Sequence, residues 1–267
     1  MEKGQEVAWW SAGVTSAITC WLAIRRNPDV RIVYIHIDDA HPDNERFKTD
    51  CEKWYGKPIE PIKSKKYSSV SEVIQETGFV NGAYGARCTL ELKKEVRVDY
   101  QNANNITAQY FGFEFEKKQI NRAVRFFDKY QDINPIFILI EERLTKNECA
   151  GILLNAGIAL PVMYLLGFEN NNCIGCVKGG KWYWNKIRVH FPMVFQQRAL
   201  DERVAGFSCI KGVFLDELKP NTGRKNKEVT AECGAFCQSE FKDVFDKRTD
   251  LILKGELKIQ HLNLFAA

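Results

Sequence analysis

Residues 7–24 read Val-Ala-Trp-Trp-Ser-Ala-Gly-Val-Thr-Ser-Ala-Ile-Thr-Cys-Trp-Leu-Ala-Ile, which is a strand-like run, a short turn and a helix-like run. Val7 to Trp10 has the composition of a strand, and Ala17 to Ile24 that of an apolar helix. Because small residues let the backbone approach an anion, and because the first N–H groups of a helix point outward, the turn predicts a phosphate-binding site. Its hydroxyl groups would add further hydrogen-bond donors: Ser11, Thr15 and Ser16.

Strand-like and helix-like runs alternate over residues 1–168. Further strands are predicted at 31–38, 58–62, 106–113 and 135–140, and helices at 44–55, 70–77 and 144–157. This alternation implies an α/β fold with a doubly wound, mostly parallel sheet and helices on both faces. Beyond residue 168 the pattern changes to loops rich in Gly, Lys and Cys, with one long helix over about 184–204. We therefore predict a nucleotide-binding core over 1–168 and a Cys-rich C-terminal lobe over 169–267.

The composition bounds the class of protein. The chain has 267 residues, of which 45% are hydrophobic and 12% aromatic, so it has enough apolar residues for a core and bulk disorder is excluded. Its net charge of +4 permits binding to phosphates or nucleic acid without requiring it. No apolar run approaches the length of about 18 residues that a membrane span needs, and the N-terminus is charged. These features predict a soluble, cytoplasmic protein with no membrane partner.

Nine cysteines divide into two groups. The first four, in strand-like or helix-like surroundings, are expected to be buried thiols: Cys20, Cys51, Cys88 and Cys149. If Cys88 is instead exposed, nearby lysine or arginine would lower its pKa. The last five have few apolar neighbours and are candidate metal ligands: Cys173, Cys176, Cys209, Cys233 and Cys237. Their spacing fits either Zn²⁺ or a [4Fe-4S] cluster, because both accept four thiolates.

Other polar residues follow the predicted strands, where open α/β sheets bind ligands. Asp38, in the segment 38–43, is a candidate for binding ribose hydroxyls or Mg²⁺. In the same segment, Asp43 could instead cap the next helix. Gly112 lies at the end of the 106–113 strand, and four cations after it could reach a phosphate tail or be a solvated face: Lys117, Lys118, Arg122 and Arg125.

A second basic segment combines cations with aromatic residues. Lys178 and Lys181 are followed directly by Trp182, Tyr183 and Trp184. Such residues could stack on a base and hold a nucleic-acid backbone. Packing of these rings between the lobe and the core is the alternative.

Four ordered segments, over residues 7–240, resemble the PP-loop adenine nucleotide α-hydrolase superfamily, in its phosphoadenosine phosphosulfate (PAPS) reductase-like branch. The turn 11–16 is similar to the PP-loop pattern Ser-Gly-Gly-x-Asp-Ser, with Ala12 and Thr15 in place of a glycine and the aspartate. The other similar segments are 34–55, 87–93 and 144–176, the last ending in Cys-Ile-Gly-Cys. Residues 230–234, Thr-Ala-Glu-Cys-Gly, are in addition similar to the Glu-Cys-Gly of sulfonucleotide reductases.

The resemblance implies a nucleotide site and candidate catalytic residues. ATP or a related adenine nucleotide, with Mg²⁺, would bind the turn, and Asp38 and Gly112 would complete the site; the turn residues are Ser11, Ala12, Gly13, Val14, Thr15 and Ser16. Cys233, Cys88 and Lys93 are the candidate catalytic residues.

Three functions remain open. The first is an ATP-dependent sulfur-transfer enzyme that adenylates a nucleic-acid or small-molecule acceptor and takes sulfur from a donor protein, a cysteine or a cluster. The second is a sulfonucleotide reductase in which Cys233 is the nucleophile and a thiol protein is the reductant. The third, favoured by Ala12 and Thr15, is a non-catalytic nucleotide-binding protein with a structural zinc.

Overall fold

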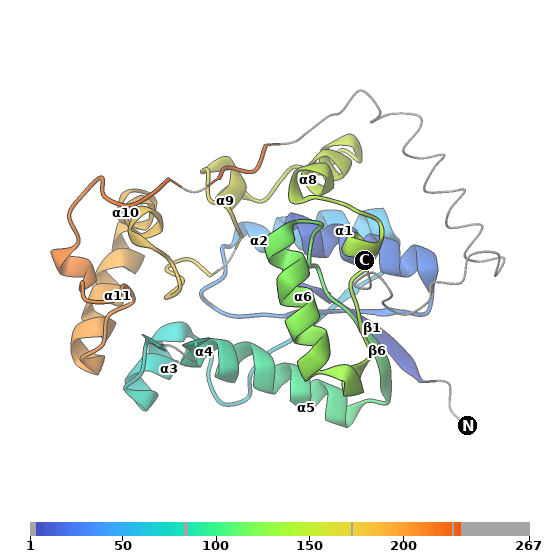
Figure 1. The fold of residues 1–267 in the computed structure, drawn as a ribbon, viewed down its shortest axis with the longest axis horizontal. Helices are drawn as coiled ribbons and strands as arrows, with labels where there is room; N and C mark the ends of the chain where they lie inside the picture. The colour runs from blue at the N-terminus through green and yellow to red at the C-terminus, as the bar shows by residue number, and fades with distance from the viewer. Residues whose placement is uncertain (1–3, 83–84, 172, 226, 231–267) are drawn as a thin grey trace.

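Five parallel strands form the central sheet of the computed structural model, which describes residues 4–82, 85–171, 173–225 and 227–230. The strands pair in the order β3-β2-β1-β6-β7 (Figure 1). Their bounds are Gln5–Trp10 for β1, Arg31–Ile35 for β2, Ile59–Ile62 for β3, Ile106–Tyr110 for β6 and Pro135–Ile136 for β7. All four pairings are parallel, so the predicted α/β class with a parallel sheet is confirmed.

Helices cover both faces of this sheet (Figure 1). On one face lie α1 (Val14–Arg26), α2 (Asp43–Tyr55), α7 (Ile138–Glu141) and α8 (Lys146–Asn155), and on the other lie α5 (Glu95–Ala103) and α6 (Lys117–Lys129). The side chains of β1 alternate between the two layers. Trp10 packs with α1 and α2, whereas Trp9 packs against Tyr100 of α5. The thiols of Cys20, Cys51 and Cys149 are buried, as predicted. None of the helices in the described ranges has the length and apolar content needed to cross a bilayer.

The order of the strands creates a crevice at their carboxyl ends. From β1 the chain proceeds to β2 and β3 on one side, and it later places β6 and β7 on the other side. The direction of winding therefore reverses next to β1. In open α/β sheets, ligands bind outside the carboxyl ends of the strands at this reversal. The turn that contains Ser11 follows β1 there.

A second group of elements packs around its own apolar cluster. It combines α3 (Val70–Thr77), the hairpin of β4 (Asn81–Gly82) and β5 (Gly85–Ala86), α4 (Arg87–Thr89), the π-helix η1 (Leu90–Lys94), α9 (Val162–Leu165), α10 (Lys181–His190), α11 (Pro192–Ala205) and η3 (Leu215–Glu217). The buried Trp184 is one of its largest side chains. We call this group the second cluster; it joins residues 67–92 to residues beyond 162.

A buried ion pair ties the second cluster to the sheet. Arg198 of α11 is 2% exposed and donates to Asp39, just after β2, at 3.0 Å. Arg198 also pairs with Asp201 at 2.9 Å. The carbonyl of Asp39 accepts from the N–H of Ile174 at 2.8 Å. The Cys173–Cys176 turn is thereby fixed beside the carboxyl end of β2.

Two predicted elements are wrong in type or extent. The run 135–140 forms only the short strand β7, because the chain turns at Phe137 and continues as α7. A short, fully buried apolar run does not distinguish a strand from a helix. The predicted helix 184–204 is two helices, α10 and α11, which meet at Phe191. Pro192 lacks an N–H group and fits only the first turn of a helix, so it ends one helix and starts the next.

Candidate functional site

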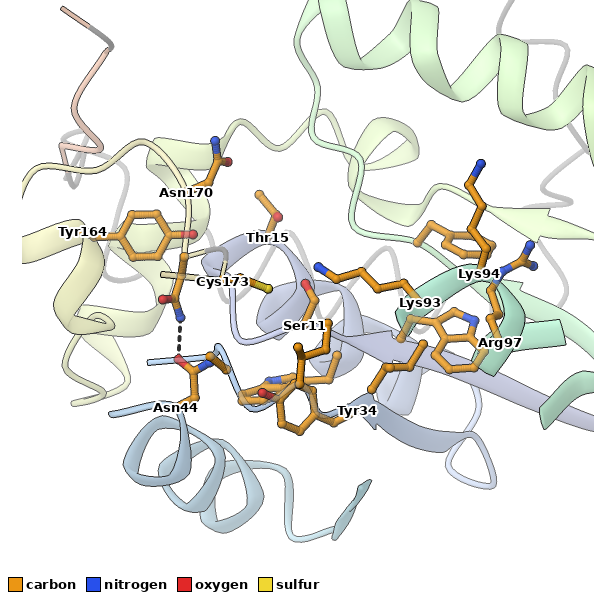
Figure 2. Close-up of a pocket in the computed structure, with 18 residues that line it drawn as sticks. Ser11, Thr15, Tyr34, Asn44, Lys93, Lys94, Arg97, Tyr164, Asn170 and Cys173 are labelled. Carbon is orange, nitrogen blue, oxygen red and sulfur yellow. Dashed lines mark hydrogen bonds between the residues drawn. The ribbon is translucent and has the colours of Figure 1, made fainter. Parts of the chain in front are cut away.

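A cleft of about 300 Å³ lies at the carboxyl end of β1 (Figure 2). This volume is at the lower end of the range of small-molecule sites, about 300–1,000 Å³. Strands β1, β2 and β6, the first turn of α1, the start of α2, η1, α5 and the segment 164–173 contribute its walls. Its lining includes Ser11, Gly13, Thr15, Asn44, Lys93, Lys94, Arg97, Tyr164, Asn171 and Cys173. Residues from four distant parts of the sequence therefore meet here.

The turn after β1 is held in shape by one hydroxyl group. Ser16 Oγ accepts from the N–H of Ser11 at 3.0 Å and from the N–H of Gly13 at 3.2 Å. The same hydroxyl donates to the carbonyl of Gly13 at 2.9 Å. Ala12 has a φ of +60°, in the left-handed region that favours glycine. Alanine is strained in this conformation, so the surrounding contacts hold Ala12 in it.

Side chains from the second half of the chain also hold this turn. The carbonyl of Ala12 accepts from Asn171 Nδ2 at 2.7 Å, and the same nitrogen donates to Asn44 Oδ1 at 2.8 Å (Figure 2). The N–H of Val14 donates to the hydroxyl of Tyr164 at 3.3 Å. These contacts account for the position of Asn44 and Asn171 at the cleft, which the sequence analysis did not predict.

Gly112 packs directly against the turn. A Cβ atom at this position would lie 3.1 Å from both the Cα and the N of Ser16. A side chain at residue 112 would therefore require the chain after β6 and the start of α1 to move apart by a few tenths of an ångström. Gly112 does not line the cleft, so the structure gives this predicted binding residue a packing contact with the turn.

Three residues of the turn line the cleft. They are Ser11, Gly13 and Thr15, whereas Ala12, Val14 and Ser16 are buried and do not line it. The N–H of Thr15 has no acceptor within the helix, because the first turn of an α-helix leaves its N–H groups unpaired. Together with the helix dipole, this group favours an anion at this end of α1.

Cations line the opposite wall. Lys93 and Lys94 lie in the π-helix η1, which continues into α5 with Arg97. In Figure 2 the ammonium group of Lys93 points into the middle of the cleft, toward Ser11 and Cys173. No aspartate or glutamate is among the described residues of the lining. The cleft therefore has the positive end of the α1 dipole on one side and lysine side chains on the other. Short π-helical segments within helices often lie at functional sites.

Arg97 is a buried cation of this wall. It is 9% exposed, and burial lowers its pKa. Its guanidinium lies 5.9 Å from the ring centres of Phe111 and Phe126 and 5.4 Å from that of Tyr130. Its contact with Gln109 Oε1 is long, at 3.5 Å. Within the described ranges Arg97 forms no ion pair with a carboxylate, so its charge adds to that of the cleft.

One thiol reaches the cleft, and three others lie in the second cluster. Cys173 lines the cleft, whereas Cys88, Cys176 and Cys209 pack among the apolar side chains of the second cluster. The hydroxyl of Tyr183 shapes the Cys173–Cys176 turn, because it accepts from the N–H of Cys176 at 2.8 Å and donates to the carbonyl of Cys173 at 3.1 Å. The structure thus brings Cys88 near two predicted metal ligands.

Burial governs the acidity of these thiols. It raises the pKa of Cys88 to about 11, with Cys176 and Cys173 adding to the rise and Lys178 and Lys93 opposing it. Burial also raises the pKa of Cys173 and of Cys209. The lowered pKa that was expected for an exposed Cys88 is therefore not found. Within the described ranges no three His, Cys, Asp or Glu side chains are arranged as a metal site. Cys233 and Cys237 lie outside the described residues.

Several other predicted residues lie away from the cleft. Asp38 pairs with His36 at 3.4 Å and is not part of the lining. Asp43 is the first residue of α2; burial would raise its pKa, but hydrogen bonds from Arg46 and from the N–H of Val162 outweigh burial and lower it. The predicted basic residues after Gly112 lie on α6, and none of them lines the cleft: Lys117, Lys118, Arg122 and Arg125.

The aromatic segment after Lys181 serves packing. Tyr183 and Trp184 are buried in the second cluster, and Trp182 is half-buried with Lys186 Nζ 4.7 Å from its ring centre. Two of the three rings are thus unavailable for stacking on a base. The packing alternative for this segment fits the structure.

No family model matches this chain. No curated protein matches it either.

Proposed function

We propose that this chain is an enzyme of the PP-loop, PAPS reductase-like type that binds an adenine nucleotide in the cleft and uses it in sulfur chemistry. The supporting observation is that the turn after β1, the ammonium group of Lys93 and the thiol of Cys173 meet in one cleft (Figure 2). An anion cradle, a cation and a thiol are what a reaction between a nucleotide and sulfur requires.

In this proposal the phosphate groups of the nucleotide lie between the start of α1 and Lys93. The N-terminus of a helix acts as roughly half a positive charge, and Lys93, Lys94 and Arg97 add one charge each. This sum of about three and a half positive charges matches the two to four negative charges of a nucleotide that carries a phosphate chain or a sulfonate. The part-exposed apolar side chains of Ile35, Ala40 and Phe111 give the same cleft a surface for the nucleoside.

Mg²⁺ fits this cleft poorly. The ion prefers oxygen ligands that include carboxylates, and no carboxylate lines the cleft among the described residues. Thr15 stands where the PP-loop pattern has its aspartate. Lysine and arginine side chains would therefore neutralise the nucleotide in place of a protein-held metal ion, and we derive no step through Mg²⁺.

Zinc and a [4Fe-4S] cluster likewise have no complete ligand set in the described ranges, because no three thiols converge. No step of the proposal depends on either group. A metal held by the last five cysteines stays a prediction, and metal analysis together with the absorbance of anaerobically purified protein tests it.

The absence of carboxylates from the described lining gives weight to a second candidate function. ATP-dependent sulfur transfer cleaves ATP to pyrophosphate, a reaction in which Mg²⁺ normally takes part. In a sulfonucleotide reductase, a cysteine thiolate instead forms a bond to the sulfonate sulfur, and the bond from that sulfur to the phosphate oxygen breaks. The nucleotide leaves with this oxygen, and the step needs cations but no metal-bound pyrophosphate. The cationic cleft with Cys173 in its wall supports this alternative alongside sulfur transfer.

Calorimetric titration tests the shared part of both functions. We expect ATP, AMP and adenosine phosphosulfate to be bound, with binding that survives removal of Mg²⁺ by a chelator. Lys93→Met should weaken each Kd by about tenfold or more, since one ionic contact contributes about 1.5–3 kcal/mol. Lys118→Met is the matched control, because Lys118 is exposed on α6 outside the cleft. Failure of the natural protein to bind any of the three nucleotides would refute the proposal.

Product analysis separates the two functions. Pyrophosphate release from ATP in the presence of an acceptor supports sulfur transfer. Sulfite release from a sulfonucleotide, in the presence of a thiol that reduces the S-sulfocysteine intermediate, supports the reductase. Binding without either product supports the non-catalytic alternative.

A further inference from the structure

The outer face of α6 carries a stripe of cations that the cleft does not use. Lys118, Arg122, Arg125 and Lys129 are spaced i, i+4, i+7 and i+11, so they lie on one side of the helix. All four residues are exposed. Within the part of the chain that the structure describes, none of the four forms an ion pair with a carboxylate. We call these four residues the α6 stripe.

Helix stability does not explain the α6 stripe. Like charges at i, i+3 and i, i+4 destabilise a helix, and the stripe contains three such neighbouring pairs. Cations near the N-terminus of a helix also oppose its dipole, and the first turn of α6 contains Lys117 and Lys118 and no acidic residue. The only acidic residue within the helix is Asp128. The N-cap Glu116 lies 3.6 Å from Lys227.

The helix that carries the stripe packs against one wall of the cleft. The guanidinium of Arg122 lies 4.9 Å from the ring centre of Phe113, which follows β6. Phe111, two residues earlier, lines the cleft. At the other end of the helix, Phe126 and Tyr130 contact Arg97 of the cationic wall. In Figure 1, α6 lies in front of the sheet with α5 beside it. Packed aromatic side chains therefore connect the helix that carries the stripe to the cationic wall of the cleft.

The geometry of the stripe matches a phosphodiester backbone. From Lys118 to Lys129 the helix rises about 16 Å, at 1.5 Å per residue. A stacked strand has one phosphate per 3.4 Å, so the stripe spans about five phosphates. Phe115, immediately before the helix, is 37% exposed, and an exposed ring beside a cationic track is the usual arrangement for stacking unpaired bases.

We propose that the α6 stripe binds the backbone of a single-stranded nucleic acid and directs it toward the cleft. Only the role of this strand as the acceptor of the reaction rests on the proposed function; the binding itself does not. The acceptor class would then be a polynucleotide, in which a base or a chain end enters the cleft next to the bound nucleotide.

Fluorescence anisotropy with a short labelled single strand tests the proposal. The triple variant Lys118→Gln, Arg122→Gln, Arg125→Gln should lose about 100-fold in affinity at about 0.1 M salt, because each lost phosphate contact removes about 0.7 from the slope of log K against log salt. The slope itself should fall by about 2. The matched control is Lys53→Gln, Lys63→Gln, Lys65→Gln, which removes the same charge from exposed positions on α2 and after β3.

The outcomes separate the explanations. Equal losses in the two triple variants would show an effect of net charge and would overturn the proposal, as would absence of binding by the natural protein at low salt. Tighter binding of a DNA duplex than of either single strand would also overturn it. RNA and DNA forms of the strand distinguish the two sources of the backbone. Nucleotide calorimetry on the stripe variant should be unchanged, so failure of nucleotide binding in the natural protein would refute only the proposed function.

Discussion

Ser16→Ala removes one hydroxyl group. We expect it to weaken nucleotide binding more than any other substitution in α1 that removes a single hydroxyl or methyl group. Ser16 is 3% exposed, and its hydroxyl makes three hydrogen bonds within the turn, with partners at 2.9, 3.0 and 3.2 Å. In the variant, the N–H groups of Ser11 and Gly13 lose this acceptor. The turn then has less to hold Ala12 in its left-handed conformation.

The expected magnitude follows from these contacts. Each hydrogen bond contributes about 1 kcal/mol, and the left-handed conformation of an alanine costs about 1 kcal/mol or more. Water can replace part of the loss, because Ser11 is exposed. A net cost of about 2 kcal/mol for restoring the turn upon binding corresponds to a Kd about 30-fold weaker, at 1.4 kcal/mol per tenfold.

Calorimetric titration with AMP measures the Kd, and urea unfolding measures stability. The control is Ser68→Ala, an exposed serine whose contacts are with Glu72. Adding Ala12→Gly to Ser16→Ala should recover part of the affinity, because glycine adopts a φ of +60° without strain. An unchanged Kd in Ser16→Ala, with normal binding in the natural protein, would refute the reasoning that this turn holds the phosphate groups.

Three further changes test other parts of the site. Gly112→Val should lower the free energy of unfolding by about 1–3 kcal/mol in urea, since its Cβ would lie 3.1 Å from Ser16. Gly180→Ala should cost no more than about 1 kcal/mol, because a Cβ there meets no atom within 4 Å and the change affects only the N-cap of α10. Burial raises the pKa of Cys88 from 9.0 to about 11, so the stability that the neutral thiol contributes is complete below pH 9 and is lost as the pH rises through 11. The unfolding midpoint of Cys88→Ala should therefore fall less with pH than that of the natural protein, and identical pH profiles would contradict this assignment. Thr15→Asp should make ATP binding depend on Mg²⁺, and Thr15→Asn, of the same size but neutral, should not; calorimetry with and without chelator decides.

The sequence was sufficient for most strands of the sheet and for the helices α1, α2 and α8, because their signals are local, whereas α5 was not predicted. The β-branched run 31–38 and the helical spacing in 44–55 are properties of neighbouring residues, and both elements form close to the expected bounds. The errors arise where tertiary packing decides. Phe137 begins a turn that lets the following apolar residues enter two different clusters, and no local pattern indicates this.

The site could be predicted only in part, because tertiary packing also decides which residues meet there. The turn 11–16 has a local composition that predicts an anion cradle, and it lines the cleft. Asn44 and Asn171 are separated by 127 residues, and only the fold brings their side chains into contact. The π-helix that places Lys93 and Lys94 has no sequence signal that we recognised. The aspartate at position 38 was expected at the site because it follows β2, but the chain bends so that its carboxylate pairs with His36 instead.

The two departures from the PP-loop pattern have different consequences. Ala12 changes only the conformational cost of the turn, because its side chain is fully buried and its φ is the one that glycine would adopt. The hydrogen bonds of Ser16 and Asn171 offset that cost. Thr15 changes the chemistry, because it lines the cleft and carries no charge. In the proposed function, a turn of this shape with a neutral residue at position 15 would keep its N–H donor for phosphate groups and would lack a carboxylate ligand for their metal ion. The two residues would therefore change how a nucleotide is neutralised and cleaved, without removing the hydrogen-bond donor that the turn offers to its phosphate groups.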